Sequence, residues 1–182
     1  MTLNEFDREN ALTMKPRGYL QLTSDLGWAG ETTTFINVLS TDSAVFSSLN
    51  ERVFDDHALM TLGGRDYYVN KTEGQLYTDG GVTTDALVYA ATSDGYLAAR
   101  ATTLVVDGVT LFAANKPVSL AVGEGEPAVI CYSSEETVNL KLRLMKKQKK
   151  TLINETPVKG VKYRDGNVTL SLPQGNGEIV FE

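Results

Sequence analysis

The chain has 182 residues, of which 42% are hydrophobic and 22% are charged, as is typical of a globular protein with one domain of ordinary size. Seventeen basic and twenty-three acidic residues leave a net charge of −6, which argues against a general nucleic-acid binder because such proteins usually have an excess of basic residues over one whole side of the molecule. The single cysteine excludes an intramolecular disulfide bond, and no apolar run approaches the ~18 residues of a membrane-spanning helix.

The N-terminal part of the chain gives the weakest structural signal. Residues 1–15 are polar and have no hydrophobic period, which predicts a flexible arm or linker ahead of a single domain over residues 16–182. Strands are predicted over residues 18–23 and 32–40. Residues 41–56 follow no clear period and are predicted to form a loop or a short helix.

Residues 84–122 carry the clearest pattern in the sequence. Short apolar runs rich in Val, Leu, Tyr and Thr alternate there with turn signals. The pairs Asp94-Gly95 and Asp107-Gly108 can supply the positive φ angles of tight hairpins, and Asn115-Lys116-Pro117 is a third predicted turn. We therefore expect a meander of antiparallel strands, each about five to eight residues long.

The strands that follow show the alternation of a half-buried sheet. In residues 137–144 the leucines at 140, 142 and 144 should point inward, and Lys141 and Arg143 outward, because side chains alternate between the two faces of a strand. Cys131 lies in the apolar run AVICY and is predicted to be a small core residue.

The whole pattern predicts an all-β fold. About fifteen short strand candidates, no convincing long helix and turn residues at regular spacing favour an antiparallel, jelly-roll-like sandwich of two sheets. Two stacked sheets would allow the inner faces of so many short strands to bury each other.

Catalytic signals are weak in this sequence. The single histidine, His57, follows Asp55 and Asp56, but a metal site needs three or four ligands, so a structural or solvent-facing role is expected. Aspartates in Asp-Gly turns could hold calcium if they clustered, yet turn geometry accounts for them and we expect no cofactor. Serine-nucleophile and phosphate-binding motifs do not occur. A carboxylate pair for glycosidic cleavage and a tyrosine-based β-elimination remain alternatives.

Two groups of residues are candidates for binding a ligand. The first is aromatic: the only tryptophan lies in a glycine-framed loop, and two adjacent tyrosines in one strand must point to opposite faces, so that one of them can offer a ring to a sugar. The second is a basic run, in which lysines could act as point charges for carboxylates or sulfates, although a solvated turn that protects strand edges is the alternative. The candidate ligand-binding residues are Trp28, Tyr67, Tyr68, Lys146, Lys147, Lys149 and Lys150.

Four segments carry a resemblance to a known family: FINVLSTDS at 35–43, DYYVNKTEGQLYTDG at 66–80, TTLVVDGVTLFAANKPVSLAV at 102–122 and the closing NVTLSLPQGNGEIVFE. They resemble strands of the C-terminal β-sandwich of heparinase II/III-type, alginate-lyase-like polysaccharide lyases. The resemblance implies an accessory sandwich that accompanies a catalytic domain. It carries over no catalytic residue, because the helical toroid that holds most of them in those lyases has no counterpart here.

The function expected from these observations is a non-catalytic, carbohydrate-binding or accessory β-sandwich module of a polysaccharide-degrading enzyme. Its expected partners are a polysaccharide, anionic if the basic run binds it, and an upstream catalytic domain of the same polypeptide; no nucleic acid or membrane is expected. Two alternatives stay open: a purely structural sandwich that packs on a catalytic domain, and a small polysaccharide lyase.

Overall fold

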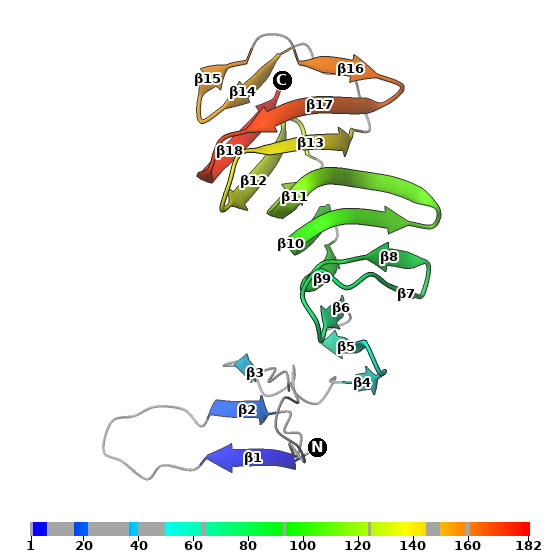
Figure 1. The fold of residues 1–182 in the computed structure, drawn as a ribbon. Helices are drawn as coiled ribbons and strands as arrows, with labels where there is room; N and C mark the ends of the chain where they lie inside the picture. The colour runs from blue at the N-terminus through cyan, green and yellow to red at the C-terminus, as the bar shows by residue number, and fades with distance from the viewer. Residues whose placement is uncertain are drawn as a thin grey trace, which may run out of the picture.

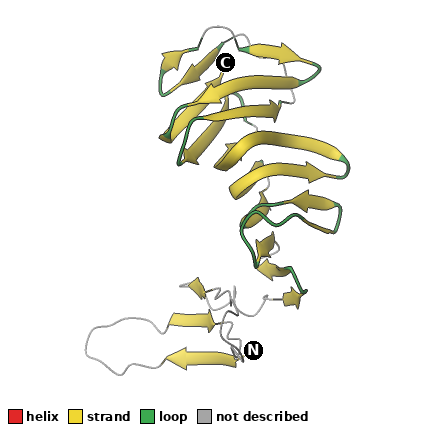
Figure 2. Cartoon of the chain, viewed as in Figure 1, coloured by secondary structure: helices red, strands yellow, loops and turns green. Residues whose placement is uncertain are grey.

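A computed structural model of the chain describes residues 2–6, 17–21, 37–39, 50–62, 65–92, 94–123, 125–144, 150–158 and 161–182. The regular structure in these ranges is antiparallel β-strand, and they contain no helix (Figure 2). The predicted all-β antiparallel class is therefore confirmed. No stretch of the described residues forms a helix that is long and apolar enough to cross a membrane.

The strands are short at both ends of the chain and long in the middle. In chain order they are β1 (Thr2–Phe6), β2 (Arg17–Gln21), β3 (Asn37–Leu39), β4 (Asn50–Val53), β5 (His57–Leu62), β6 (Arg65–Asn70), β7 (Tyr77–Asp79), β8 (Val82–Thr84), β9 (Val88–Thr92), β10 (Gly95–Val106), β11 (Val109–Gly123), β12 (Ala128–Ser134), β13 (Val138–Arg143), β14 (Thr151–Ile153), β15 (Thr156–Pro157), β16 (Lys162–Arg164), β17 (Asn167–Leu172) and β18 (Gly175–Phe181).

Strands β1 to β3 form a separate three-stranded sheet in the order β1-β2-β3. Strand β1 falls within the segment that the sequence predicts as an arm, and it pairs with β2 from Thr2 opposite Gln21 to Phe6 opposite Arg17. Strand β3 covers only part of the strand predicted over residues 32–40. The sequence predicts a loop or a short helix over residues 41–56. Residues 50–53 of this segment form strand β4, and its first nine residues lie outside the described ranges.

The other fifteen strands form one open, hydrogen-bonded sheet with two branches. One branch runs β15-β14-β18-β12-β11-β10-β9-β6-β5-β4, and the other runs β16-β17-β13-β11-β10-β8-β7. Strands β10 and β11 belong to both branches, and Figure 1 shows this long green hairpin across the middle of the sheet. The sequence predicts two separate sheets. The structure instead has one sheet, whose two layers are joined through the shared strands β10 and β11.

Strands β10 and β11, at 12 and 15 residues, are longer than the five to eight residues predicted. The hairpin turn between them is confirmed, since Asp107 and Gly108 have φ angles of 49° and 76°. The predicted turn at residues 115–117 is wrong, because these residues lie inside β11. They fall between the half that pairs with β13 and the half that pairs with β12, so Pro117 occupies a position where no ladder bond needs its missing N–H.

A bend in β10 allows the hairpin to serve both branches. The register between β10 and β11 shifts between Ala98 and Thr103, and Arg100 within this bulge has a φ of 50°. The buried carboxylate of Asp85 holds the bend: it accepts hydrogen bonds from the backbone N–H groups of Thr102 (2.9 Å) and Thr103 (3.0 Å) and from the Thr102 hydroxyl (2.5 Å). These backbone N–H groups are not part of the regular hydrogen-bonding pattern between strands, so the carboxylate takes the place of the missing backbone acceptor.

The two branches bury their facing sides in one hydrophobic core. Leu140 and Leu142 of β13 share a cluster of buried residues with Ile130 of β12 and Ile179 of β18, which belong to the other branch. As predicted, Leu140, Leu142 and Leu144 are buried, whereas Lys141 and Arg143 are exposed. The prediction that Cys131 is a core residue is wrong: Ile130 and Tyr132 take the inward positions of β12, and alternation turns the thiol between them to the outside.

Replacing Leu142 by Ala should lower the free energy of unfolding by roughly 2–5 kcal/mol, because Leu142 is fully buried and the change leaves a cavity in the core. Chemical denaturation measures the loss. Lys141→Ala, one residue away on the exposed face, is the control and should change stability by less than about 0.5 kcal/mol. Equal losses in the two variants would mean that the register of β13 is wrong.

Replacing Asp85 by Ala should lower the free energy of unfolding by about 3 kcal/mol, because the backbone N–H groups of Thr102 and Thr103 in the bend of β10 lose their buried, charged acceptor. The matched control is Asp66→Ala, which removes an exposed carboxylate that accepts a hydrogen bond from the Thr61 hydroxyl, and it should cost about 1 kcal/mol or less. Hydrogen exchange should show the loss at Thr102 and Thr103. Unchanged protection of these two amides would contradict the role of Asp85.

Candidate functional site

The residues singled out by sequence are not brought together in the described structure. Trp28, Lys146, Lys147 and Lys149 lie outside the described residues, so their roles stay predictions. Lys150 lies just before β14, and its Nζ is 3.0 Å from a carboxylate oxygen of Glu182. The two tyrosines of β6 point to opposite faces as expected: Tyr68 is buried in the core at 7% exposure, and Tyr67 is half-buried on the other side.

Basic side chains gather instead on the outer face of β13, β17 and β16. Residues directly opposite in an antiparallel sheet point to the same side. In one cross-strand row Lys141 lies opposite Thr169, which lies opposite Lys162. In the next row Arg143 and Arg164 flank Asn167 in the same way. We call Lys141, Arg143, Lys162 and Arg164 the basic face; all four are exposed.

The local sequence explains why these side chains share one side. Each strand alternates, with Leu142 and Val168 buried in the core between the outward residues and Tyr163 packed against it. The Asp165-Gly166 turn, with φ angles of 52° and 75°, fixes the register of β16 on β17 and so aligns the two rows. Rows two residues apart are ~7 Å apart along a strand, and the outer strands of three are ~10 Å apart, so the four cations mark the corners of a small rectangle.

The basic face has little negative charge to neutralise it. Strands β13, β16 and β17 contain no Asp or Glu. The nearby Asp165 lies in the turn, where its Oδ2 is 3.3 Å from Arg164 Nε; both side chains are more than 80% exposed, so this pair is weak and exchangeable. Asn139, Ser171 and Thr169 add exposed hydrogen-bonding groups to the same side.

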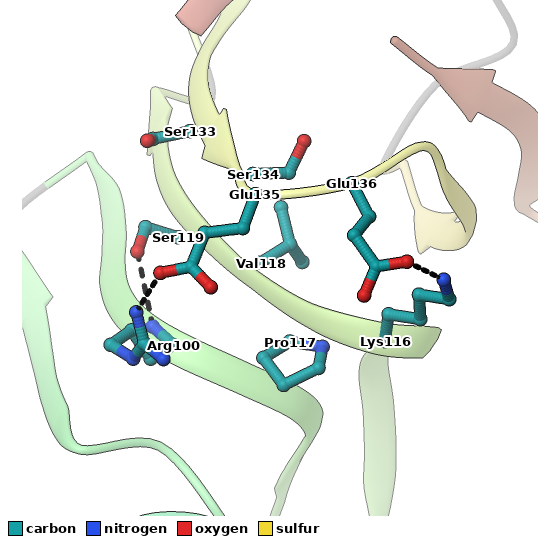
Figure 3. Close-up of a pocket in the computed structure, with 9 residues that line it drawn as sticks. All are labelled: Arg100, Lys116, Pro117, Val118, Ser119, Ser133, Ser134, Glu135 and Glu136. Carbon is teal, nitrogen blue, oxygen red and sulfur yellow. Dashed lines mark hydrogen bonds and ion pairs between the residues drawn. The ribbon is translucent and has the colours of Figure 1, made fainter. Parts of the chain in front are cut away.

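A shallow pocket of about 110 Å³ lies where the bend of β10 meets β11 and the turn after β12 (Figure 3). Its cations are already paired. Arg100 contacts Glu135 and Glu73, each at 2.6 Å, and this double pairing raises the pKa of the guanidinium. Lys116 forms an ion pair with Glu136 on the other side of the pocket. The pocket therefore offers polar groups that are fixed in place, but no free positive charge.

His57 lies at the end of the core, between two carboxylates. Its Nδ1 is 2.6 Å from Asp56 and its Nε2 is 3.6 Å from Asp79. The imidazole is stacked between Phe54 and Tyr77, with ring centroids 4.4 and 4.7 Å away, and only 4% of His57 is exposed. Because both faces of the ring are covered, the geometry supports the structural role that the sequence predicts. Among the described residues, no group of three or more His, Cys, Asp or Glu is placed to hold a metal ion.

Sequence reasoning found only half of the basic face. Lys141 and Arg143 are visible as the outward positions of an alternating strand, but Lys162 and Arg164 are each 21 residues further along the chain. The signal that could have joined them is the alternation of VKYR followed by Asp165-Gly166, which predicts a hairpin with both cations on one side. Comparison with protein-family models and with curated proteins gives no match for this chain.

The contact between Asp56 and His57 predicts a pH effect on stability. The hydrogen bond to His57 holds the pKa of Asp56 below its ordinary value of 3.8, so the stability it contributes is present above pH 3.8 and is lost as the pH falls through the lower, folded-state pKa. The melting-temperature difference between the wild type and Asp56→Asn should therefore be present near pH 5 and close as the pH falls well below 3.8. The exposed neighbour provides the control, Asp55→Asn. A difference that persists in strong acid would contradict the assignment.

Proposed function

We propose that this chain is a non-catalytic accessory module that binds an anionic polysaccharide, and that it holds an associated polysaccharide-degrading domain on its substrate. The observation that carries the proposal is the basic face, where four exposed cations stand in two aligned rows on strands without carboxylates. A regular array on a rigid sheet suits a polymer whose charges repeat along its length.

The array can act locally although the whole chain has a net charge of −6. Charges at a distance are screened beyond ~8 Å at physiological salt, so a carboxylate or sulfate on the basic face responds to the nearest cations rather than to the net charge. The carboxylates that contact Arg100 and Lys116 lie in turns outside the three strands of the basic face, and each is paired with one of these two cations.

The two kinds of cation would contribute differently. Lys141 and Lys162 are compact point charges, which tolerate carboxylates in several orientations. Arg143 and Arg164 present planar forks that can bind a carboxylate or sulfate through two parallel hydrogen bonds. Between them, Thr169 and Asn167 can hydrogen-bond to sugar hydroxyls, so the face combines charge recognition with contacts that any polysaccharide offers.

Of the three aromatic residues predicted to stack on a sugar ring, only Tyr67 and Trp28 remain candidates. Tyr68 is buried, so its ring is occupied in the core. Tyr67 lies on β6, several strands away from β16 and β17, and Figure 1 shows these elements in different parts of the sheet. Trp28 remains a predicted stacking residue. The binding proposal rests on charge and hydrogen bonding alone.

Reversing one cation of the basic face should weaken binding to alginate or heparin about fivefold, since each exposed charge contact contributes up to ~1 kcal/mol. Lys141→Glu and Lys162→Glu test one row, and the double variant should lose more. Affinity electrophoresis at several salt concentrations measures the retention, which should decrease as salt rises.

Arg65→Glu is the matched control, because it makes the same change in net charge at an exposed position of β6. It should leave retention nearly unchanged, and all variants should keep the wild-type melting temperature. A wild-type protein that shows no salt-sensitive retention by alginate or heparin would refute the proposal. So would an Arg65→Glu variant that is weakened as much as Lys162→Glu, since net charge alone would then explain binding.

A further inference from the structure

The two branches of the sheet meet through side chains at the ends that carry their first strands. One branch ends in β6-β5-β4 and the other in β8-β7. Within the described residues, β7 has β8 as its one strand partner, so only side chains connect it to β5. His57 of β5 stacks on Tyr77 of β7 with ring centroids 4.7 Å apart, and its Nε2 lies 3.6 Å from Oδ2 of Asp79, the last residue of β7. The single histidine of the chain therefore lies at the contact between the two layers.

One proton of the imidazole is fixed by Asp56. Its Oδ1 is 2.6 Å from Nδ1 of His57, and this hydrogen bond holds the pKa of Asp56 below its ordinary value. The carboxyl group is therefore charged at neutral pH and can only accept a hydrogen bond, so Nδ1 must be the donor. In the neutral imidazole the other nitrogen, Nε2, then has a lone pair and no hydrogen.

This second nitrogen faces another acceptor. Nε2 of His57 and Oδ2 of Asp79 are both buried, and neither has a hydrogen-bond partner among the described residues. With a neutral ring, a lone pair and a carboxylate oxygen would face each other across 3.6 Å in a site with little water, which is costly for both groups. A proton on Nε2 replaces this repulsion by attraction between an imidazolium ion and a carboxylate.

The other charged groups near the ring do not satisfy this pair. Arg52 of β4 approaches Asp79 at 3.9 Å, but its side chain is 60% exposed, so the contact is weak. Lys71, after β6, donates a hydrogen bond to the backbone carbonyl of Phe54. Glu51 lies opposite Met60 and so points to the other side of β4, and Asp55 is exposed.

The uncharged neighbours keep their state across the pH range in which a histidine changes charge. Burial raises the pKa of the hydroxyl groups of Tyr68 and Tyr77, so both stay protonated well above neutral pH. Asn70, opposite His57 on β6, cannot titrate, and its side-chain amide donates a hydrogen bond to the carbonyl of Gln75 at 2.5 Å. The proton on Nε2 is thus the one change that neutral pH can make in this contact.

We propose that Asp56, His57 and Asp79 form a pH-sensitive contact between the two layers, in which the imidazolium ion bridges both carboxylates and loss of its Nε2 proton releases the β7–β8 hairpin from β5. Histidine is the side chain that ordinarily changes charge between pH 5 and 8. Both strands of the hairpin have three residues, and so short a hairpin is marginally stable without tertiary contacts. Since the closed contact holds the proton, opening becomes more frequent as the pH rises.

The single histidine allows this proton to be observed directly. In proton–nitrogen correlation spectra of the whole protein, both ring nitrogens should be protonated at pH 5, and Nε2 should lose its proton as the pH rises to 8. Hydrogen-exchange protection of residues 77–84 should fall at least about tenfold over the same range, after correction for the intrinsic pH dependence of exchange. Protection of Leu140 and Leu142, in β13, should stay unchanged.

Asp79→Asn tests the partner of the ring. The amide that it introduces can donate to Nε2 of a neutral imidazole and accept from an imidazolium ion, so protection of residues 77–84 should no longer depend on pH. Asp66→Asn is the matched control, because it makes the same change at an exposed position of β6 and should keep the wild-type pH dependence.

Three results would overturn the proposal. The first is equal protection of residues 77–84 at pH 5 and pH 8 in the wild type, and the second is a pH dependence that Asp79→Asn leaves unchanged. The third is a histidine ring that is already neutral at pH 5 in the folded protein. None of the three residues belongs to the basic face, so the outcome is independent of polysaccharide binding.

Discussion

The carboxylate of Asp85 is the contact on which the rest of the sheet depends. A long antiparallel hairpin would normally stay in a single sheet, because its hydrogen-bonding ladder extends in one plane. The bend in β10 interrupts this ladder at Thr102 and Thr103, and Asp85 accepts the bonds that the bend frees. On either side of the bend the same two strands pair with different neighbours, β9 and β12 on one side and β8 and β13 on the other. One buried acceptor thus allows a continuous sheet to form two layers around one core.

The two-layer arrangement also separates the chemistry of the two outer sides. Each layer directs its large aliphatic residues into the shared core, so the outward positions are free to differ. On β13, β17 and β16 they are cationic and hydrogen-bonding, whereas residues 95–99 of β10, residues 119–123 of β11 and strand β12 carry no charged side chain.

Alternation within a single strand made part of the site predictable. The outward positions of Lys141 and Arg143 follow from the leucines between them. The pairing of Lys141 with Lys162, across Thr169, depends on the order β13-β17-β16, which no local signal encodes. The same limit applies to Cys131: its apolar neighbours suggested burial, but in a strand whose two faces differ, the register decides which residues turn inward.

The sequence by itself determined the all-β class, the hairpin at Asp107-Gly108 and the buried side of β13, since each depends on residues close together in the chain. The tertiary structure decided the length of β10 and β11, the fate of the turn signal at Asn115-Lys116-Pro117 and the joining of two predicted sheets into one. Those features depend on which strands meet at the bend, where the Asp85 carboxylate and the core between the layers outweigh local turn preference. Local sequence patterns determine to which face of a strand a side chain points, whereas the packing of the whole sheet determines which side chains become its neighbours.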